Sequence, residues 1–137
     1  MLSSLERGIF LQVIVDTSFL MIPGIFGIDV MNELERLLER PCKLLIPSPV
    51  VRELRQISER GKPEEKVAAR VGLLLVKRGS TVSVKGKADE CILKLAGKKR
   101  YVVGTTDSAL RKELRCIGIP VIYLRQKSHL ALDGQIG

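Results

Sequence analysis

The sequence predicts an α/β protein, a three-layer α/β/α sandwich around a central, mostly parallel sheet of five strands. Short β-branched runs alternate with longer segments that place apolar residues every three or four positions. Several of the short runs are almost entirely apolar, as buried parallel strands are. A length of 137 residues with 45% hydrophobic content fits a single domain, 1–137, with residues 1–10 and 128–137 as peripheral extensions.

The first strand, helix and second strand follow from three adjacent patterns. QVIVD at 12–16 is a β-branched run and is expected to be a buried strand. Residues 29–40 have helical spacing and are ended by Pro41. The apolar face of this helix consists of Val30, Leu34, Leu37 and Leu38. KLLI at 43–46 is the second predicted strand.

Two helices are expected to follow in succession. Ser48 is the predicted N-cap and Pro49 the first residue of a helix that ends before Gly61. The next helix is predicted over 63–77, before Gly79. The residues of this second helix that are expected to face inward are Val67, Val71, Leu74 and Leu75.

The last part of the chain repeats the strand and helix alternation. TVSV at 81–84 and YVVG at 101–104 are predicted strands, with a helix over 87–96 between them. Asp107 is the predicted N-cap of the final helix, which precedes the strand VIYL at 121–124. The apolar residues at helical spacing in that final helix are Leu110, Leu114 and Ile117.

Cysteine and histidine usage excludes several kinds of site. Cys42, Cys91 and Cys116 are an odd number without metal-ligand spacing, which favours a reducing, cytoplasmic location. His129 is the only histidine and no CxxC occurs, which argues against a zinc site and a Ser-His-Asp triad. No signal peptide or membrane-spanning stretch is recognisable, so a soluble, unprocessed protein is expected.

Four carboxylates fall where the carboxyl ends of parallel strands are expected to lie. Asp16 ends the first strand in VIVDTS, and Asp107 follows the fourth strand in YVVGTTDSAL. Asp89 lies in the first turn of the helix that leaves the third strand. Glu53 lies about one turn into the helix that begins at Pro49. Since this edge of an open parallel sheet carries the ligand site, the four acids are expected to line one cavity.

Each acid also has an ordinary structural explanation. Asp107 is explained as a helix N-cap, Asp89 as an acid at the positive end of a helix dipole, and Glu53 as a solvated helix residue. Asp16 is harder to explain, because a carboxylate after three β-branched residues is costly unless it is paired or metal-bound. If the four acids converge, a divalent cation relieves their repulsion. Oxygen-only ligation suits one or two Mg²⁺ or Mn²⁺ ions, which activate water for attack on a phosphodiester.

Basic residues are concentrated near the end of the sequence. Residues 98–127 hold eight Lys and Arg against two acids, a net charge of +6 within a chain of net charge +8. These basic residues are Lys98, Lys99, Arg100, Arg111, Lys112, Arg115, Arg125 and Lys127. A charged surface that serves solubility is the simpler explanation. The excess of one sign favours a polyanion, and with only five aromatic residues we expect RNA-backbone contacts by these eight residues.

The sequence resembles the PIN-domain ribonucleases over nearly its whole length from Gln12 onward. The matching motifs, in order, are VIVDTSFLMIP, PSPVVREL, KADECILKLA and VVGTTDSALRKELRCIGIPVIYLRQ. The resemblance implies a four-carboxylate site of Asp16, Glu53, Asp89 and Asp107. It implies a metal-dependent endoribonuclease that acts on RNA, and it prefers Asp89 to Glu90 because of the D-x-x-I context. The closing motif is most similar to archaeal relatives of the PIN endonucleases that process small-subunit ribosomal RNA precursors.

Supporting residues and departures from the family pattern surround these acids. Ser18 stands where many members carry Asn, and its hydroxyl is expected to contact a carboxylate or a water at the metal. Thr105 provides the T-x-D context, and Thr106 and Glu90 are further supporting candidates. Toxin-type members usually have a different closing motif. Monomer and homodimer both remain open, and no membrane partner is expected.

Three alternatives were weighed against this hypothesis. A haloacid dehalogenase-type enzyme needs a second acid two residues after the first, where Ser18 stands. A receiver-type signalling domain needs its acid directly after the third strand, and Asp89 lies too far into the helix. The third alternative is a non-catalytic PIN-fold protein that binds RNA or assists assembly in a ribonucleoprotein. Retention of all four acids argues against it.

Overall fold

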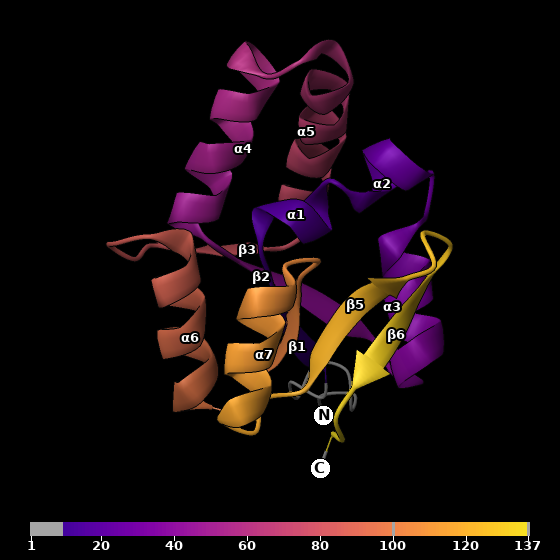
Figure 1. Cartoon of the computed structure of the whole chain (residues 1–137), viewed down its shortest axis with the longest axis vertical. Coiled ribbons are helices and arrows are strands. Elements are labelled where there is room, and N and C mark those ends of the chain that lie inside the picture. The colour runs from indigo at the N-terminus through magenta and orange to yellow at the C-terminus, as the bar shows by residue number, and fades with distance from the viewer. Residues whose placement is uncertain (1–9, 100, 137) are drawn as a thin grey trace, which may run out of the picture.

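A computed structural model describes residues 10–99 and 101–136, and it contains one six-stranded sheet in the order β3-β2-β1-β4-β5-β6 (Figure 1). The first five strands are parallel, and the last pairs antiparallel with its neighbour. The strands are β1 (Leu11–Val15), β2 (Cys42–Pro47), β3 (Ser80–Val82), β4 (Val102–Gly104), β5 (Val121–Arg125) and β6 (His129–Asp133). The predicted mostly parallel sheet is therefore confirmed.

The sixth strand was not predicted. Residues 128–137 were expected to be a peripheral extension, but β6 pairs with β5 from Arg125↔His129 to Val121↔Asp133. The turn between the two strands places Gln126 and Lys127 at φ 54° and 55°, a conformation in which glycine or asparagine is usual. Because that turn contains neither residue, the hairpin carries no recognisable sequence signal. The corresponding expectation for residues 1–10 falls almost entirely outside the described residues.

Seven helices lie within the described residues. They are α1 (Thr17–Leu20), α2 (Ile22–Phe26), α3 (Val30–Leu38), α4 (Ser48–Arg60), α5 (Pro63–Val76), α6 (Ala88–Lys98) and α7 (Ser108–Cys116). The last five match the predicted helices. The first two are only four and five residues long, too short for a periodic apolar pattern to indicate them. None of the described helices is long and apolar enough to cross a membrane.

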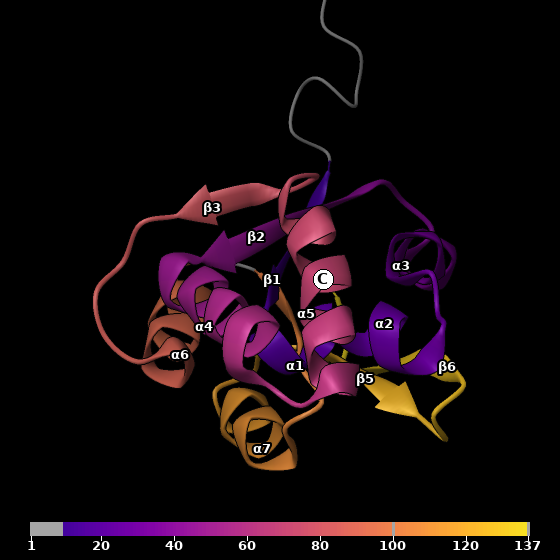
Figure 2. The same cartoon turned by 90° about the horizontal axis from the view of Figure 1, so that it is seen from above.

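The helices form the two outer layers of the expected sandwich. α6 contacts β1, β2 and β4, and α7 contacts β5, so these two helices cover one face of the sheet. α3 contacts β2 and β6 on the other face (Figure 2). α4 and α5 pack against each other and rise as a pair beyond the carboxyl ends of the parallel strands (Figure 1). The edge beneath that pair is where the predicted site lies.

The buried face of α5 differs from the prediction. Val67 and Leu74 were expected to face inward, but 55% and 61% of their surface is exposed. The buried positions are Ala68, Ala69, Gly72 and Leu75. A Cβ on Gly72 would lie 2.8 Å from the carbonyl oxygen of Leu20. α5 therefore turns its smallest residues toward α1 and α2, because the close approach leaves no room for larger side chains. Ile117, expected inward at the end of the final helix, is likewise 55% exposed.

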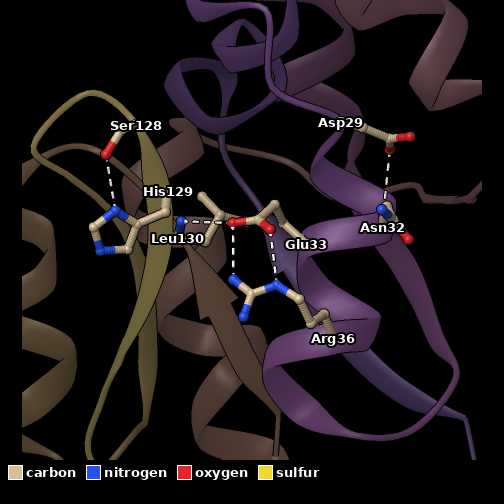
Figure 3. A network of polar contacts seen from close by, with 7 residues as sticks. All are labelled: Asp29, Asn32, Glu33, Arg36, Ser128, His129 and Leu130. Carbon is tan, nitrogen blue, oxygen red and sulfur yellow. Dashed lines mark hydrogen bonds and ion pairs between the residues drawn. The ribbon is translucent and has the colours of Figure 1, made fainter.

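A polar network fastens the β5–β6 hairpin to α3 (Figure 3). The Glu33 carboxylate accepts a hydrogen bond from the Leu130 backbone N–H at 3.3 Å. It also pairs with the Arg36 guanidinium at 3.0 Å. The pKa of Glu33 is lowered, chiefly by the hydrogen bond from Arg36. At the hairpin itself, the Ser128 hydroxyl lies 2.9 Å from Nδ1 of His129. The network explains how α3 holds the antiparallel edge of the sheet in place.

The start of α4 also differs from the prediction. Ser48 does not cap the helix, because α4 begins at that residue and Pro47 occupies the N-cap position. The Ser48 hydroxyl instead donates to the carbonyl of Val84 at 3.1 Å and accepts from its N–H at 3.0 Å. Ser48 therefore joins the first turn of α4 to the segment that leads from β3 into α6.

Candidate active site

The site is built where neighbouring strands β1 and β4 end. Val15 is in register with Gly104, and the Asp16 N–H donates to the Gly104 carbonyl at 3.2 Å. Each strand then passes directly into a loop that carries a predicted acid. The first turns of α4, α6 and α7 lie at the same edge of the sheet (Figure 1). The topology therefore brings the segments with all four predicted acids to one edge, as parallel sheets do with their ligand sites.

Asp16 is the most firmly held of the four acids. Only 7% of its surface is exposed. Its Oδ1 atom accepts the Ser18 hydroxyl at 2.7 Å and the Phe19 backbone N–H at 2.9 Å, so it caps the short helix α1. Its Oδ2 atom accepts a hydrogen bond from the Thr105 hydroxyl. These donors come from α1, which follows β1, and from the residue after β4, so the fold itself fixes the direction of this carboxylate.

Thr105 links Asp16 to the second strand-end acid. It is fully buried, and the hydroxyl that donates to Asp16 accepts the Asp107 backbone N–H at 3.0 Å. Asp107 is exposed and caps α7 by accepting the N–H groups of Ala109 and Leu110 at 2.9 and 3.3 Å. One hydroxyl group thus separates the Asp16 carboxylate from the backbone of Asp107.

The two other supporting residues at these strand ends also lie beside Asp16. The Thr106 backbone N–H donates to the Ser18 hydroxyl at 3.0 Å, and Ser18 in turn donates to Asp16. Ser18 therefore bridges the loop after β1 and the loop after β4. Thr106 takes part in this bridge through its backbone, so the threonine side chain is not what the contact requires.

The electrostatics of Asp16 reflect its burial. Desolvation raises the pKa of its carboxyl above the ordinary value, and the negative charge of Asp89 raises that pKa further. Hydrogen bonds from Thr105, Ser18 and the Phe19 N–H act in the opposite direction but do not cancel the rise. Asp89 is thus close enough to Asp16 to act on it through its charge. A bound cation would favour the ionised form of this carboxyl.

Glu53 and Asp89 lie at the flanks of the edge and are less constrained. Both side chains are exposed, as is that of Glu90, the one acid among the supporting candidates. Within residues 10–99 and 101–136, no three His, Cys, Asp or Glu side chains lie close enough together to hold one metal ion. The oxygen-only donors at this edge suit a hard divalent cation. The exposed acids would have to turn toward Asp16 to share that cation, a rotamer change that exposed side chains make readily.

The predicted RNA-binding residues do not form one surface around these acids. Arg111 pairs with Asp133 at 2.8 Å and lies 3.5 Å from the centre of the Tyr123 ring. Arg115 also pairs with Asp133, at 3.2 Å. Lys98 ends α6, and an eleven-residue helix places it about 15 Å from the first turn that carries Asp89. The next residue, Lys99, lies at the same remote end.

The other members of that predicted set have mixed positions. Arg125 and Lys127 lie at the β5–β6 turn, and Lys112 is exposed on α7. Arg100 lies outside the described residues. An RNA-binding role for the set stays a prediction. Two of its arginines, Arg111 and Arg115, are already paired with Asp133 of β6.

Two features of the site were not predicted from the sequence. The first is the Phe19 N–H, which donates to the Asp16 carboxylate and helps to orient it. The available signal was the sequence DTSF, in which Asp16 stands at an N-cap position three residues before a hydrophobic residue. Thr17 is buried beside Asp16, and its hydroxyl is the one buried side-chain polar atom without a hydrogen-bond partner among the described residues. No pattern in the sequence distinguishes Thr17 from an ordinary first-turn threonine.

Comparisons with known proteins agree with the fold. A family model described as a PIN-like domain matches residues 13–127. Ribonuclease VapC4 of Methanocaldococcus jannaschii is 31% identical over 129 residues, which cover 91% of this chain and 98% of that protein. The rRNA-processing protein utp23 of Schizosaccharomyces pombe is 31% identical over 121 residues, 84% of this chain and 45% of that protein.

A solved structure shows the same fold. The PIN domain endonuclease Utp24 superimposes with a TM-score of 0.75 over 91% of this chain and 92% of that one, at 24% identity. The matched family region includes all four predicted acids, from Asp16 near its start to Asp107 near its end. On the family match and the relatives together, the chain belongs to the PIN-like domain family.

Proposed function

We propose that this protein is a divalent-metal-dependent endoribonuclease that hydrolyses RNA phosphodiester bonds at the site around Asp16. The observation that carries the proposal is the buried Asp16 carboxylate, which is hydrogen-bonded through Thr105 to the loop of Asp107. A relative of nearly the same length is named a ribonuclease, and nucleases of this family generally use divalent metals. Burial disfavours the ionised form of this carboxylate, and a bound cation would offset that cost in free energy.

The four acids would hold Mg²⁺ or Mn²⁺, as one ion or two. Bound there, the cation would polarise the phosphate and lower the pKa of the attacking water. The role of Asp16 is to present a fixed oxygen pair, because its three donors allow it one orientation. Asp107 caps α7 through Oδ1, so its second oxygen takes no part in the cap. Asp89 and Glu53 would complete the ligand set from α6 and α4.

We further propose that precursor ribosomal RNA is the physiological substrate. The support is the relative named as an rRNA-processing protein, which is 31% identical over 84% of this chain. The aromatic side chains of Tyr101 and Tyr123 belong to the sheet region, and Tyr123 is covered by Arg111. With few rings to stack on bases, RNA binding is expected to rest on the phosphate backbone. A cytoplasmic location remains a prediction.

One observation favours a second function, an RNA-binding PIN-like protein that does not cleave. Within the described part of the chain, no three acidic side chains are close enough to ligate one ion, and Glu53 is exposed. A protein of this kind would keep the buried Asp16 for structural reasons and would bind RNA in an assembly. The two functions differ in a single measurable property, which is metal-dependent cleavage.

The deciding experiment compares the wild-type chain with Asp16→Asn in Mg²⁺, in Mn²⁺ and in EDTA. The substrates are a structured small-subunit rRNA precursor and a generic single-stranded RNA. We expect the wild type to cleave in either metal and not in EDTA, and Asp16→Asn, Asp89→Asn and Asp107→Asn to be inactive while folded. Wild-type-like cleavage by a clean preparation of Asp16→Asn would rule out the proposed site.

A matched control separates metal binding from helix capping. Asp29 caps α3 just as Asp107 caps α7, with Oδ1 accepting the Asn32 N–H at 3.1 Å (Figure 3). Unlike α7, α3 covers the other face of the sheet. Asp29→Asn therefore alters a cap of the same kind without touching the site. It should cleave like the wild type. If Asp29→Asn and Asp107→Asn lose activity equally, Asp107 acts as a structural cap and not at the metal.

A further inference from the structure

The loop between β3 and α6 is held unusually firmly for an exposed segment. Val84, its second residue, exchanges two hydrogen bonds with the Ser48 hydroxyl of α4. The carbonyl of Lys85 accepts the Cys91 thiol at 3.3 Å. Gly86 follows at φ +115°, a conformation that side-chain-bearing residues rarely adopt. Lys85, Gly86 and Lys87, here termed the lysine loop, are therefore anchored to α4, which carries Glu53 in its second turn, and to α6, which carries Asp89 in its first turn.

The lysine loop points its charge into solvent at the carboxylate edge. Lys85 and Lys87 are exposed, and within residues 10–99 and 101–136 neither forms an ion pair. Asp89 lies two residues beyond Lys87, and no ion pair joins the two side chains. Arg52 adds a third exposed positive charge on α4, one turn beyond Ser48 on the same helix face.

The charges of the lysine loop differ in their pairing from several basic residues of the segment 98–127. Arg111 and Arg115 are occupied by Asp133, whereas the lysine loop has no such partner among the described residues. Lys98 and Lys99 carry the same two charges at the opposite end of α6. One helix therefore has a lysine pair at each end, and only the pair at its start lies beside Asp89. That arrangement makes the remote pair an internal control.

We propose that the lysine loop binds the phosphate backbone of single-stranded RNA next to the bond that is cleaved. The inference rests on the proposed ribonuclease function and adds to it the surface that holds the substrate. A cluster of acids repels RNA, so a strand that approaches them needs fixed positive charge at the rim. The two anchors hold the backbone of Lys85 and Lys87 in place before RNA arrives, and less conformational entropy is then lost on binding.

The test measures binding of a fluorescently labelled single-stranded RNA in EDTA, so that cleavage plays no part. The variants are Lys85→Ala with Lys87→Ala, and Lys98→Ala with Lys99→Ala, which remove equal charge from the two ends of α6. For the loop variant we expect binding weaker by on the order of 10-fold at 0.1 M salt. Its salt dependence should fall by about 1.4 in log–log slope, the value for two lost phosphate contacts on a single strand.

The salt dependence makes the outcome specific to phosphate contacts. Between 50 and 200 mM salt, the wild type should lose about 7-fold more affinity than the loop variant. The Lys98 and Lys99 variant should keep the wild-type slope. Equal effects of the two pairs, or a weaker affinity with an unchanged slope, would overturn the assignment. All four side chains are exposed, so the melting temperatures should agree within about 2 °C.

Cleavage measurements separate this inference from the proposed function. In Mn²⁺, the loop variant should raise KM by the same factor as the loss of affinity and keep kcat within about twofold, because only uniform binding is removed. If the wild type cleaves RNA but the two lysine pairs behave alike, the loop assignment fails and the ribonuclease stands. If the wild type neither binds nor cleaves RNA, both are wrong.

Discussion

The carboxyl edge of the sheet has a centre and two flanks that differ in how they are held. At the centre, Asp16 is buried and accepts three hydrogen bonds, one of them from the buried Thr105. At the flanks, Glu53 on α4 and Asp89 on α6 are exposed and make no side-chain hydrogen bond or ion pair with another described residue. The same family pattern thus places acids in two physically different settings.

The difference shows which part of such a site the fold can prepare in advance. Neighbouring strands in fixed register bring Asp16 and Thr105 together, so their geometry comes with the sheet. Helices α4 and α6 bring Glu53 and Asp89 to the same edge, but they do not fix the positions of the carboxylate groups. We therefore infer a preformed centre that is costly to keep ionised and flanks that become ordered when a cation is bound. Each prediction below tests this contrast, in order of decreasing effect.

The largest expected effect is on cleavage. Asp16→Asn keeps the shape and the acceptor oxygen for Phe19 N–H but removes the fixed charge, so kcat should fall by about 10³-fold or more. Glu53→Gln removes a ligand that is less constrained, and a loss of about 10- to 100-fold is expected. Single-turnover rates in saturating Mn²⁺ measure both. Equal losses of cleavage rate would show that Asp16 and Glu53 contribute equally to catalysis and would contradict the proposed difference between centre and flank.

The next effect is on stability. Thr105→Val removes the hydroxyl between Asp16 and Asp107 and leaves a buried carboxylate oxygen and a backbone N–H without their partner. The free energy of unfolding should fall by about 1–3 kcal/mol, measured by urea denaturation in EDTA. Asp89→Asn, at an exposed flank position, should stay within about 0.5 kcal/mol of the wild type. An unchanged free energy of unfolding for Thr105→Val would mean that the two hydrogen bonds of Thr105 do not stabilise the centre of the site.

Sequence patterns predicted the fold well where burial and capping leave a periodic trace. The five parallel strands and five longer helices follow from β-branched runs, helical spacing and residues such as Pro41 and Gly79. Two errors have physical causes. The β5–β6 turn contains no glycine, so its hairpin was not indicated. On α5, Val67 and Leu74 were wrongly predicted to face inward, because the close contact with α1 and α2 requires small residues.

The candidate site was predictable in outline and not in its contacts. The strand-end rule placed Asp16 and Asp107 at one edge from the sequence alone. The hydrogen bond through Thr105 depends on β1 and β4 being neighbours in a given register, which no local pattern specifies. The ion pairs of the basic residues could not be predicted for a related reason. Counting charge along the chain cannot reveal that Arg111 and Arg115 fold back onto Asp133.

A third prediction concerns pH in the absence of metal. Burial, with the charge of Asp89, raises the pKa of Asp16 in the folded chain, so the folded state binds this proton more tightly than the unfolded state does. The stability that this proton contributes is complete below about pH 4, the ordinary carboxyl pKa. It is lost as pH rises through the raised pKa. Each unit of pKa difference corresponds to about 1.4 kcal/mol.

Thermal melts in EDTA from pH 4 to pH 8 test this linkage. Asp16→Asn lacks the titrating group, so its advantage in stability over the wild type should grow as the pH rises. Added Mg²⁺ at pH 7 should then raise the wild-type melting temperature and leave that of Asp16→Asn unchanged, because the cation stabilises only the chain that binds it. Parallel pH curves for the two chains would show that Asp16 does not carry the cost of burial assigned to it.

The smallest effect comes from Glu33, a half-buried acid that is ordered without a cation. Glu33 has a hydrogen bond to Leu130 N–H and an ion pair with Arg36, and its pKa is lowered, so its contribution has the opposite sign to that of Asp16. That contribution is present above the ordinary carboxyl pKa and is lost on acidification. Glu33→Gln should cost less than about 1 kcal/mol at pH 7, since solvent screens the pair, and added Mg²⁺ should not change that cost. Equilibrium unfolding with and without Mg²⁺ measures it. Mg²⁺ could instead alter the stability cost of Glu33→Gln as much as that of Glu53→Gln. The response to the cation would then not distinguish Glu53 from an acid outside the site. The inference that a bound ion orders the flanking acids would be wrong.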